Sequence, residues 1–190
     1  MSALPPLLAW DALHPLVVHF PIALLIVAPL FVVLAMAWQR QAKTLLSAAC
    51  ILVVLGAGSA FLATATGEAA EGLAESVPGA GAVLDRHEEL AELARNLFAG
   101  LAMVLLLATA VFWRFGERAS LTLIRCAGAA YLLLHGAASM VLLNAAHEGA
   151  RLVHETGVRA WAPASSSRSG GPSAVSTAHA RKGAGRAGPL

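Results

Sequence analysis

The chain has 190 residues, of which 58% are hydrophobic and 13% are charged, and its mean hydropathy is +0.71. Soluble domains are about 45–50% apolar and about 25% charged, so this composition argues against a soluble domain and predicts an integral membrane protein. The net charge is only +2 and the basic residues form no stripe, which excludes nucleic acid as an expected partner.

Four apolar segments are each long enough, or nearly so, to cross a bilayer, which takes about 20 helical residues. They cover residues 16–38, 44–66, 96–113 and 121–146. The expected fold is therefore an all-α integral membrane bundle of four transmembrane helices in up-down order. We expect residues 1–160 to form this bundle and residues 161–190, rich in Ser, Gly and Arg, to be a disordered tail. The first segment lacks a basic leader, so it is expected to stay in the bilayer rather than be cleaved.

The first span opens with two histidines and two prolines: His14, Pro15, His19 and Pro21. Ionisable groups are costly in hydrocarbon and proline lacks a backbone donor, so this opening requires partners from elsewhere in the chain. On a regular helix His14 and His19 point about 140° apart. Both histidines can therefore point inward only if the helix proper begins near His19. His19 is the favoured candidate, because it lies inside the helical register, whereas His14 is expected to terminate it. Pro29 is expected to kink the span, with a neighbouring helix satisfying the freed carbonyl.

The connections between the spans differ in charge, and this predicts an orientation. The two short loops hold four basic residues: Arg40, Lys43, Arg114 and Arg118. The longer acidic connection, residues 67–92, has Arg86 as its single cation. Both termini and the acidic connection are therefore predicted outside the cytoplasm, although the basic tail points weakly the other way.

The acidic connection and the end of the fourth span carry further helical signals. Asp85 is expected to cap the third helix, because the acidic residues that follow it suit a first helical turn. After the fourth span, Arg151 lies three residues after Glu148 and four before Glu155, so it is expected to pair with both. The second span carries small residues that would let another helix approach closely: Gly56, Ser59, Ala60, Ala63 and Gly67.

An up-down bundle brings most of the polar residues to one membrane face. Ten of the eleven acidic residues are expected there, together with five histidines: His14, His19, His87, His147 and His154. Three interpretations remain open: interfacial side chains that only satisfy polar ends, a metal site of His and Glu, and a b-type haem held by two histidines. For a haem, the arginines available for the propionates would be Arg86, Arg95 or Arg151.

His135 and the two cysteines are separate cases. His135 lies in the middle of the fourth span, where it is either functional or a neutral ring bonded to a facing group such as Ser59 or Thr64. No other histidine lies at that depth, which argues against a haem deep in the membrane. Cys50 and Cys126 lie in apolar runs without a CxxC or CxxCH motif, so we interpret both as small buried apolar residues.

Several motifs resemble a bacterial family of four-span membrane proteins, the domain-of-unknown-function 2231 family. The main motif is His14-Pro15-x-x-Val18-His19-Phe20-Pro21-Ile22-Ala23, with Thr66-Gly67-Glu68, His87-Glu88, Gly149, Leu152-Val153 and Gly157-Val158 in support. The resemblance covers roughly residues 10–160 and implies a membrane protein of unassigned biochemistry, located in the bacterial inner (cytoplasmic) membrane. Some relatives look to be joined to or associated with cytochromes, which favours electron transfer or metal chemistry. The chain departs from the family pattern at His154 and Thr156.

The leading hypothesis is a membrane module for electron transfer or metal binding, with haem b or a divalent transition metal as its cofactor. His19 and His87 are the expected principal ligands, and His14 and Glu68 the secondary ones. Glu88 and His154 complete the candidate metal ligands. The contrasting hypothesis is a non-enzymatic structural or assembly subunit of a membrane complex. No catalytic residue is identified, and an enzyme is not the expected class. Candidate partners besides lipid are a cytochrome or other redox protein and further copies of the chain.

Overall fold

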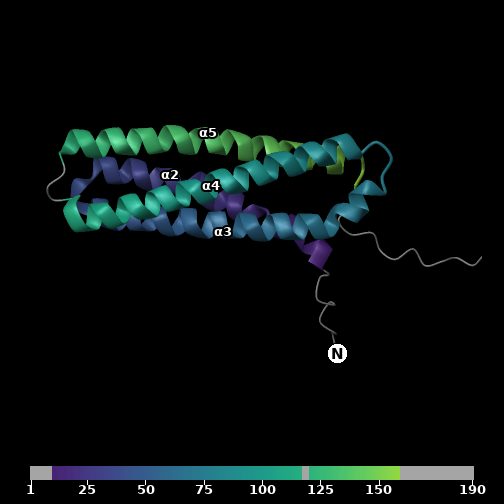
Figure 1. Cartoon of the computed structure of the whole chain (residues 1–190), viewed down its shortest axis with the longest axis horizontal. Helices are drawn as coiled ribbons and strands as arrows, with labels where there is room; N and C mark the ends of the chain where they lie inside the picture. Colours follow the sequence, from purple (N-terminus) through teal and green to yellow (C-terminus); the bar gives the residue numbers. More distant parts are fainter. Residues whose placement is uncertain (1–9, 117–119, 159–190) are drawn as a thin grey trace, which may run out of the picture.

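A computed structural model describes residues 10–116 and 120–158, which form a bundle of four long helices lying side by side (Figure 1). No strand occurs in these two ranges. The elements, in chain order, are η1 (Trp10–Leu13), α1 (His14–Val17), α2 (His19–Ala37), η2 (Gln39–Gln41), α3 (Ala42–Glu75), α4 (Gly81–Phe115) and α5 (Leu121–His154). All four long helical segments are apolar enough to span a membrane, so the predicted fold class is confirmed. The predicted tail, together with Glu117 and Arg118, lies outside the described residues.

The first span begins earlier than expected. His14 starts α1, and Val18 keeps right-handed helical angles (φ −60°, ψ −24°), so the chain stays helical from His14 into α2. Pro15 lies in the first turn of α1, where a missing N–H leaves no helical bond unmade, and Pro21 lies in the first turn of α2. The main helix of the span, α2, does start at His19, but it is preceded by the short helix α1, which starts five residues upstream at His14.

The acidic connection is mostly helix rather than loop. α3 runs on to Glu75 and α4 starts at Gly81, so only residues 76–80 join them, with a turn at Gly79 (φ +85°). Asp85 therefore lies inside α4, and Ala80 occupies the N-cap position without a side-chain hydrogen bond. The predicted Asp85 cap was wrong because an Ala-, Leu- and Glu-rich sequence propagates a helix well outside the apolar core.

The helices contact one another in a closed ring, with α2 against α3 and α5, and α4 against α3 and α5. This arrangement confirms the up-down order. The core between them is built from small or medium side chains around Phe98, and these include Leu25, Ala28, Val53, Ala57 and Ala138. Large apolar side chains cover the outside instead; Leu133, for example, is 77% exposed. An apolar exterior around a small-residue core is what lipid-embedded helices require.

His135 satisfies the backbone that Pro29 leaves open. Pro29 has no N–H to donate to Leu25, four residues earlier in α2, and the Nε2–H of His135 donates to the Leu25 carbonyl over 2.8 Å. The other ring nitrogen, Nδ1, lies 3.3 Å from the Tyr131 hydroxyl, and the ring packs edge-on against Phe98. The buried histidine is thus bonded to a facing carbonyl, as one of the two interpretations expected, although the partner is neither Ser59 nor Thr64.

Candidate functional site at the acidic end of the bundle

His14 and His87 face each other at one end of the bundle. His14 comes from α1 and His87 from the second turn of α4, and their ring centres are 6.3 Å apart with the planes at 85°. Both side chains are half-buried. His19 was the favoured inward-facing residue from the sequence. In the structure His14 faces the bundle and His19 is exposed, because the helical start at His14 turns the His14 side chain inward.

Each of the two rings is anchored in the same way on a different helix. His14 Nδ1 lies 2.9 Å from the Ala63 carbonyl of α3, and His87 Nδ1 lies 2.8 Å from the Ala145 carbonyl of α5. A carbonyl can only accept, so Nδ1 carries the proton in both rings and donates it. When such a ring is neutral, its Nε2 has a lone pair, which is the form of histidine that binds a metal.

A glycine lies one helical turn beyond each anchoring carbonyl. A Cβ built on Gly67 would be 3.1 Å from His14 Cε1, and a Cβ built on Gly149 would be 2.9 Å from His87 Cε1. Both distances are shorter than ordinary van der Waals contact, so a side chain at either position would displace the ring. The spacing Ala-x-x-x-Gly therefore occurs twice with one role, at residues 63–67 and 145–149. Thr66, fully buried, adds its hydroxyl 3.3 Å from His14 Nδ1.

The other histidines proposed as ligands do not join the pair. His19 is exposed and its Nδ1–H donates to the Pro15 carbonyl of its own turn, over 2.7 Å. His154 is exposed at the end of α5. Glu68 is also exposed, and Glu88 is half-buried. Among the side chains that the structure describes, no three His, Cys, Asp or Glu groups are arranged to hold a metal ion.

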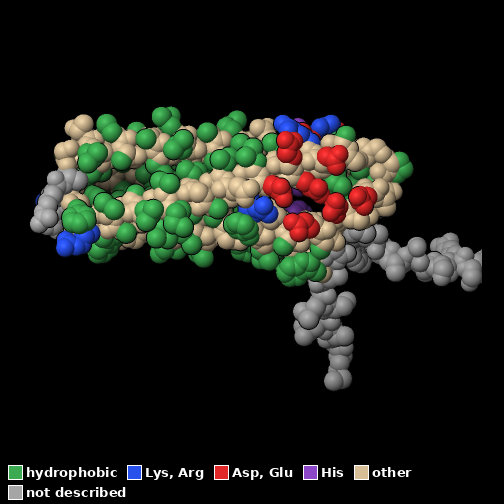
Figure 2. Space-filling view, viewed as in Figure 1, with side chains coloured by type: hydrophobic (Ala, Val, Ile, Leu, Met, Phe, Trp, Pro, Cys, Tyr) green, Lys and Arg blue, Asp and Glu red, His purple; other side chains and the backbone are tan. Residues whose placement is uncertain are grey.

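Carboxylates gather at this end of the molecule, and Figure 2 shows a group of them on one face. They come from the extensions of α3, α4 and α5 beyond the apolar core: Glu68, Glu71, Glu75, Asp85, Glu88, Glu89, Glu92, Glu148 and Glu155. The clustering of acidic residues expected from the topology is thus present. Polar helix ends of this kind are what a bundle needs where it leaves the hydrocarbon.

The three arginines considered for propionates are already paired with carboxylates. Arg86 contacts Glu89 at 2.7 Å, and Arg95 lies 3.8 Å from Glu92. Arg151 contacts Glu148 at 2.8 Å and Glu155 at 3.0 Å, as its spacing predicted. Arg95 has the longest of these contacts and is mostly buried, with a guanidinium nitrogen 3.3 Å from the Thr64 hydroxyl.

Sequence reasoning missed the residues that hold the two rings. Ala63 and Ala145 act through their backbone carbonyls, and Gly149 was noted only as a family motif. One available signal was the repeated Ala-x-x-x-Gly spacing near the end of the second helix in each hairpin. In both hairpins a histidine of the first helix thus contacts the alanine carbonyl and the glycine of this spacing in the second helix, although the two hairpins show no obvious sequence similarity.

The comparison with protein families agrees with this architecture. The model of a family described as "Predicted membrane protein (DUF2231)" matches residues 10–162, which is most of the chain and includes both histidines and both glycines. Comparisons with curated proteins and with solved structures gave no match. The chain is a multi-pass membrane protein that belongs to the domain-of-unknown-function 2231 family.

Proposed function

We propose that His14 and His87 would hold a b-type haem, and that the protein is an electron-transfer module of the bacterial inner membrane. The observation that carries this proposal is the geometry of the two rings. They lie 6.3 Å apart with near-perpendicular planes, and in each ring Nδ1 contacts a backbone carbonyl, which leaves Nε2 of the neutral ring for a ligand. The residues present therefore fit the protein's share of such a site.

The ring separation discriminates between ways of binding one metal. A metal–imidazole bond is about 2.0–2.1 Å and a ring nitrogen lies about 1.1 Å from the ring centre, so two imidazoles on opposite sides of one ion have centres about 6.2–6.4 Å apart. At a tetrahedral angle the same bonds would bring the centres to about 5.1–5.2 Å. The ring centres of His14 and His87, 6.3 Å apart, fall in the first of these two ranges, which supports one iron held between the two rings.

The number of ligands supports the same choice. A structural zinc site uses four protein ligands and a catalytic site uses three. In the described part of the chain no third His, Cys, Asp or Glu joins His14 and His87. A haem takes only two ligands from the protein, because the porphyrin supplies the other four. A site of His and Glu, with Glu88 nearest to His87 in sequence, is the less favoured form of the proposal.

Each surrounding residue has a defined part in this proposal. The Ala63 and Ala145 carbonyls fix the tautomer and orientation of the two rings, and second-shell partners of this kind also raise ligand basicity. Gly67 and Gly149 allow the rings to lie against α3 and α5. Of the three arginines considered for the propionates, Arg95 has the longest contact with a carboxylate, 3.8 Å to Glu92, and is the cation proposed for a propionate. A haem bound here would supply a one-electron couple near the membrane surface.

A second candidate function rests on the same hydrogen bonds. His14 ties α1 to α3 and His87 ties α4 to α5, so the rings could serve only to join helices at the polar end of the bundle. In that case the protein would be a non-enzymatic structural or assembly subunit. The Nδ1 hydrogen bonds are the same in both functions. The functions differ at Nε2, which binds the cofactor in the first and has no ligand in the second.

Purification from membranes in mild detergent, followed by an absorption spectrum and metal analysis, tests the proposal. A Soret band with one haem per chain is the expected result, and it should persist in the control variant His19→Ala. If Zn, Cu or Fe is present in stoichiometric amount without a Soret band, the cofactor is a metal ion and not a haem. If the protein holds neither haem nor metal after growth with added haem precursor, and binds none during hemin titration, the haem proposal fails and the structural function remains.

A further inference from the structure

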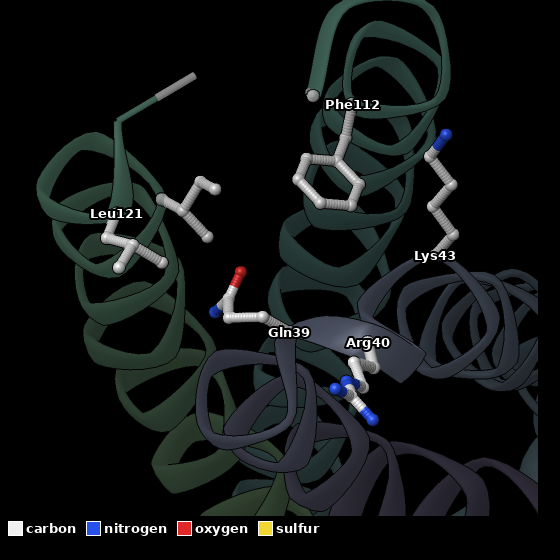
Figure 3. Close-up of a pocket in the computed structure, with 7 residues that line it drawn as sticks. Gln39, Arg40, Lys43, Phe112 and Leu121 are labelled. Carbon is white, nitrogen blue, oxygen red and sulfur yellow. The ribbon is translucent and has the colours of Figure 1, made fainter. Parts of the chain in front are cut away.

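The two ends of the bundle carry opposite charge. At one end, Arg40 and Lys43 border a pocket, and Figure 3 shows their head groups pointing away from each other. No Asp or Glu occurs in the described segments of this half, residues 30–57, 98–116 and 120–140. At the acidic end, the extensions of α3, α4 and α5 hold nine carboxylates and three arginines, which leaves an excess of six negative charges.

Five carboxylates on α3 and α4 form what we call the acidic face: Glu71, Glu75, Asp85, Glu88 and Glu92. Burial raises the pKa of the Glu88 carboxyl, and the negative charges of the other four raise it further, so the five lie close enough to repel one another. Within the described part of the chain, only Glu92 has a cation within 4.0 Å, and this is Arg95 at 3.8 Å. A cationic ligand would relieve the repulsion on this face.

The chain itself supplies cations directly beside the acidic face. Residues 159–190, the basic tail, hold no Asp or Glu and five cations: Arg159, Arg168, Arg181, Lys182 and Arg186. The tail follows Val158, which packs against an apolar cluster that includes Ala74 of α3 and Leu84 of α4. These are the two helices that carry the acidic face, so the tail leaves the bundle next to that face.

The tail is long enough to reach every carboxylate of the face. One residue spans at most about 3.3–3.6 Å, so Arg168, ten residues after Val158, can lie up to about 33–36 Å from it. Two neighbouring helices are together only about 20–24 Å wide. A ligand tethered by a short segment has an effective concentration of roughly millimolar, so weak ion pairs are sufficient to hold it.

We propose that the basic tail docks on the acidic face of its own chain. Its five cations would offset most of the six excess negative charges, and the docked tail would exclude other cationic ligands from the face until it is displaced. The tail and the face lie on the same side of the membrane in either orientation, because α5 ends at the acidic end. The proposal does not depend on a bound haem.

Zero-length cross-linking with a carbodiimide tests the docking, because it joins a lysine ammonium to a carboxylate only where the two are in contact. The chain has two lysines, and Lys182 is the one in the tail. In phosphatidylcholine nanodiscs with one chain each, mass spectrometry should find Lys182 linked to the acidic face. These links should decrease at 1 M salt, where the screening length is about 3 Å.

Two variants with equal changes in charge separate docking from general attraction. Removal of three tail cations in Arg168→Gln/Arg181→Gln/Arg186→Gln keeps Lys182 and should lower its links at least about 3-fold. The matched control Arg40→Gln/Arg114→Gln/Arg125→Gln removes three cations at the opposite end and should keep the links.

A charge exchange tests whether the two segments meet. Arg168→Glu/Arg181→Glu/Arg186→Glu should abolish the links, and adding Glu71→Arg/Glu75→Arg/Asp85→Arg should restore links from Lys182 to Glu88 and Glu92. Absence of Lys182 links in the wild type, or links that 1 M salt leaves unchanged, would overturn the proposal. Loss of the links when phosphatidylglycerol replaces half of the lipid would also overturn it, since the tail would then bind the anionic lipid surface.

Discussion

The imidazole rings of His14 and His87 lie edge to face, with their centres 6.3 Å apart, although the two residues are 73 positions apart in the chain. Each ring comes from the first helix of one hairpin and donates Nδ1–H to the second helix of the same hairpin. Two equivalent hairpins thus contribute one histidine each to a shared site. This equivalence leads to predictions that treat the two halves in parallel.

Gly67→Ala and Gly149→Ala should each disturb the ring that lies against the glycine. The added methyl group would come within 3.1 Å of His14 and 2.9 Å of His87, and such overpacking costs about 1–3 kcal/mol. We expect each variant to lower both the thermal midpoint of the purified protein and its content of bound cofactor. Gly72→Ala in α3 and Gly136→Ala in α5 are matched controls, because nothing lies within 4 Å of a Cβ at either position. A normal cofactor content in both test variants would contradict the close approach.

His19→Ala should leave cofactor content unchanged and shift stability by no more than about 0.5 kcal/mol. The side chain is exposed, and its Nδ1 partner belongs to its own helical turn. Spectroscopy and thermal unfolding of this variant beside wild type provide the measurement. Loss of the cofactor in His19→Ala would mean that the helix start is rotated relative to the structure described.

His135→Leu should destabilise the protein by about 1–3 kcal/mol, since it leaves the Leu25 carbonyl buried without a donor. Restoring the backbone donor with Pro29→Ala should reduce that loss, so the double variant should be more stable than His135→Leu alone. Unfolding of the four proteins in detergent measures the coupling between the two positions. Additive effects would show that the two positions do not share the Leu25 carbonyl.

A reporter inserted after Gly81 should score as outside the cytoplasm. Gly81 is exposed at the start of α4, and the short loops at the other end hold most of the loop cations, including Arg40, Lys43 and Arg114. Alkaline phosphatase and green fluorescent protein fusions at this site give opposite readouts. A cytoplasmic score would reverse the orientation and move the histidine pair to the reducing side of the membrane.

The fold could be predicted from the sequence because hydropathy is a local property. Runs of about 20 apolar residues determine the four spans, and short loops determine their up-down order. The helix ends could not be predicted in the same way. Through the acidic sequence, α3 continues to Glu75 and α4 already begins at Gly81. The helices are stabilised there by packing outside the main core, as between Ala74, Leu84 and Leu152.

The site was predicted only in part. The topology predicted from the sequence places His14, His19 and His87 at one membrane face. Which of His14 and His19 points inward depends on the helical phase, and this is set by the helical backbone angles of Val18 between α1 and α2. The roles of Gly67 and Gly149 depend on the register between helices of one hairpin. That register is a tertiary property, and it appears in the sequence only as the repeated Ala-x-x-x-Gly spacing.

Hemin titration of wild type, His14→Ala and His87→Ala, followed by absorption spectroscopy, tests the shared site most directly. The account predicts that wild type binds one equivalent with a six-coordinate, low-spin spectrum. Each single variant should lose that spectrum, and added imidazole should restore it by filling the vacated ligand position. A wild-type spectrum and stoichiometry in either variant would contradict the proposal that His14 and His87 bind one iron between them.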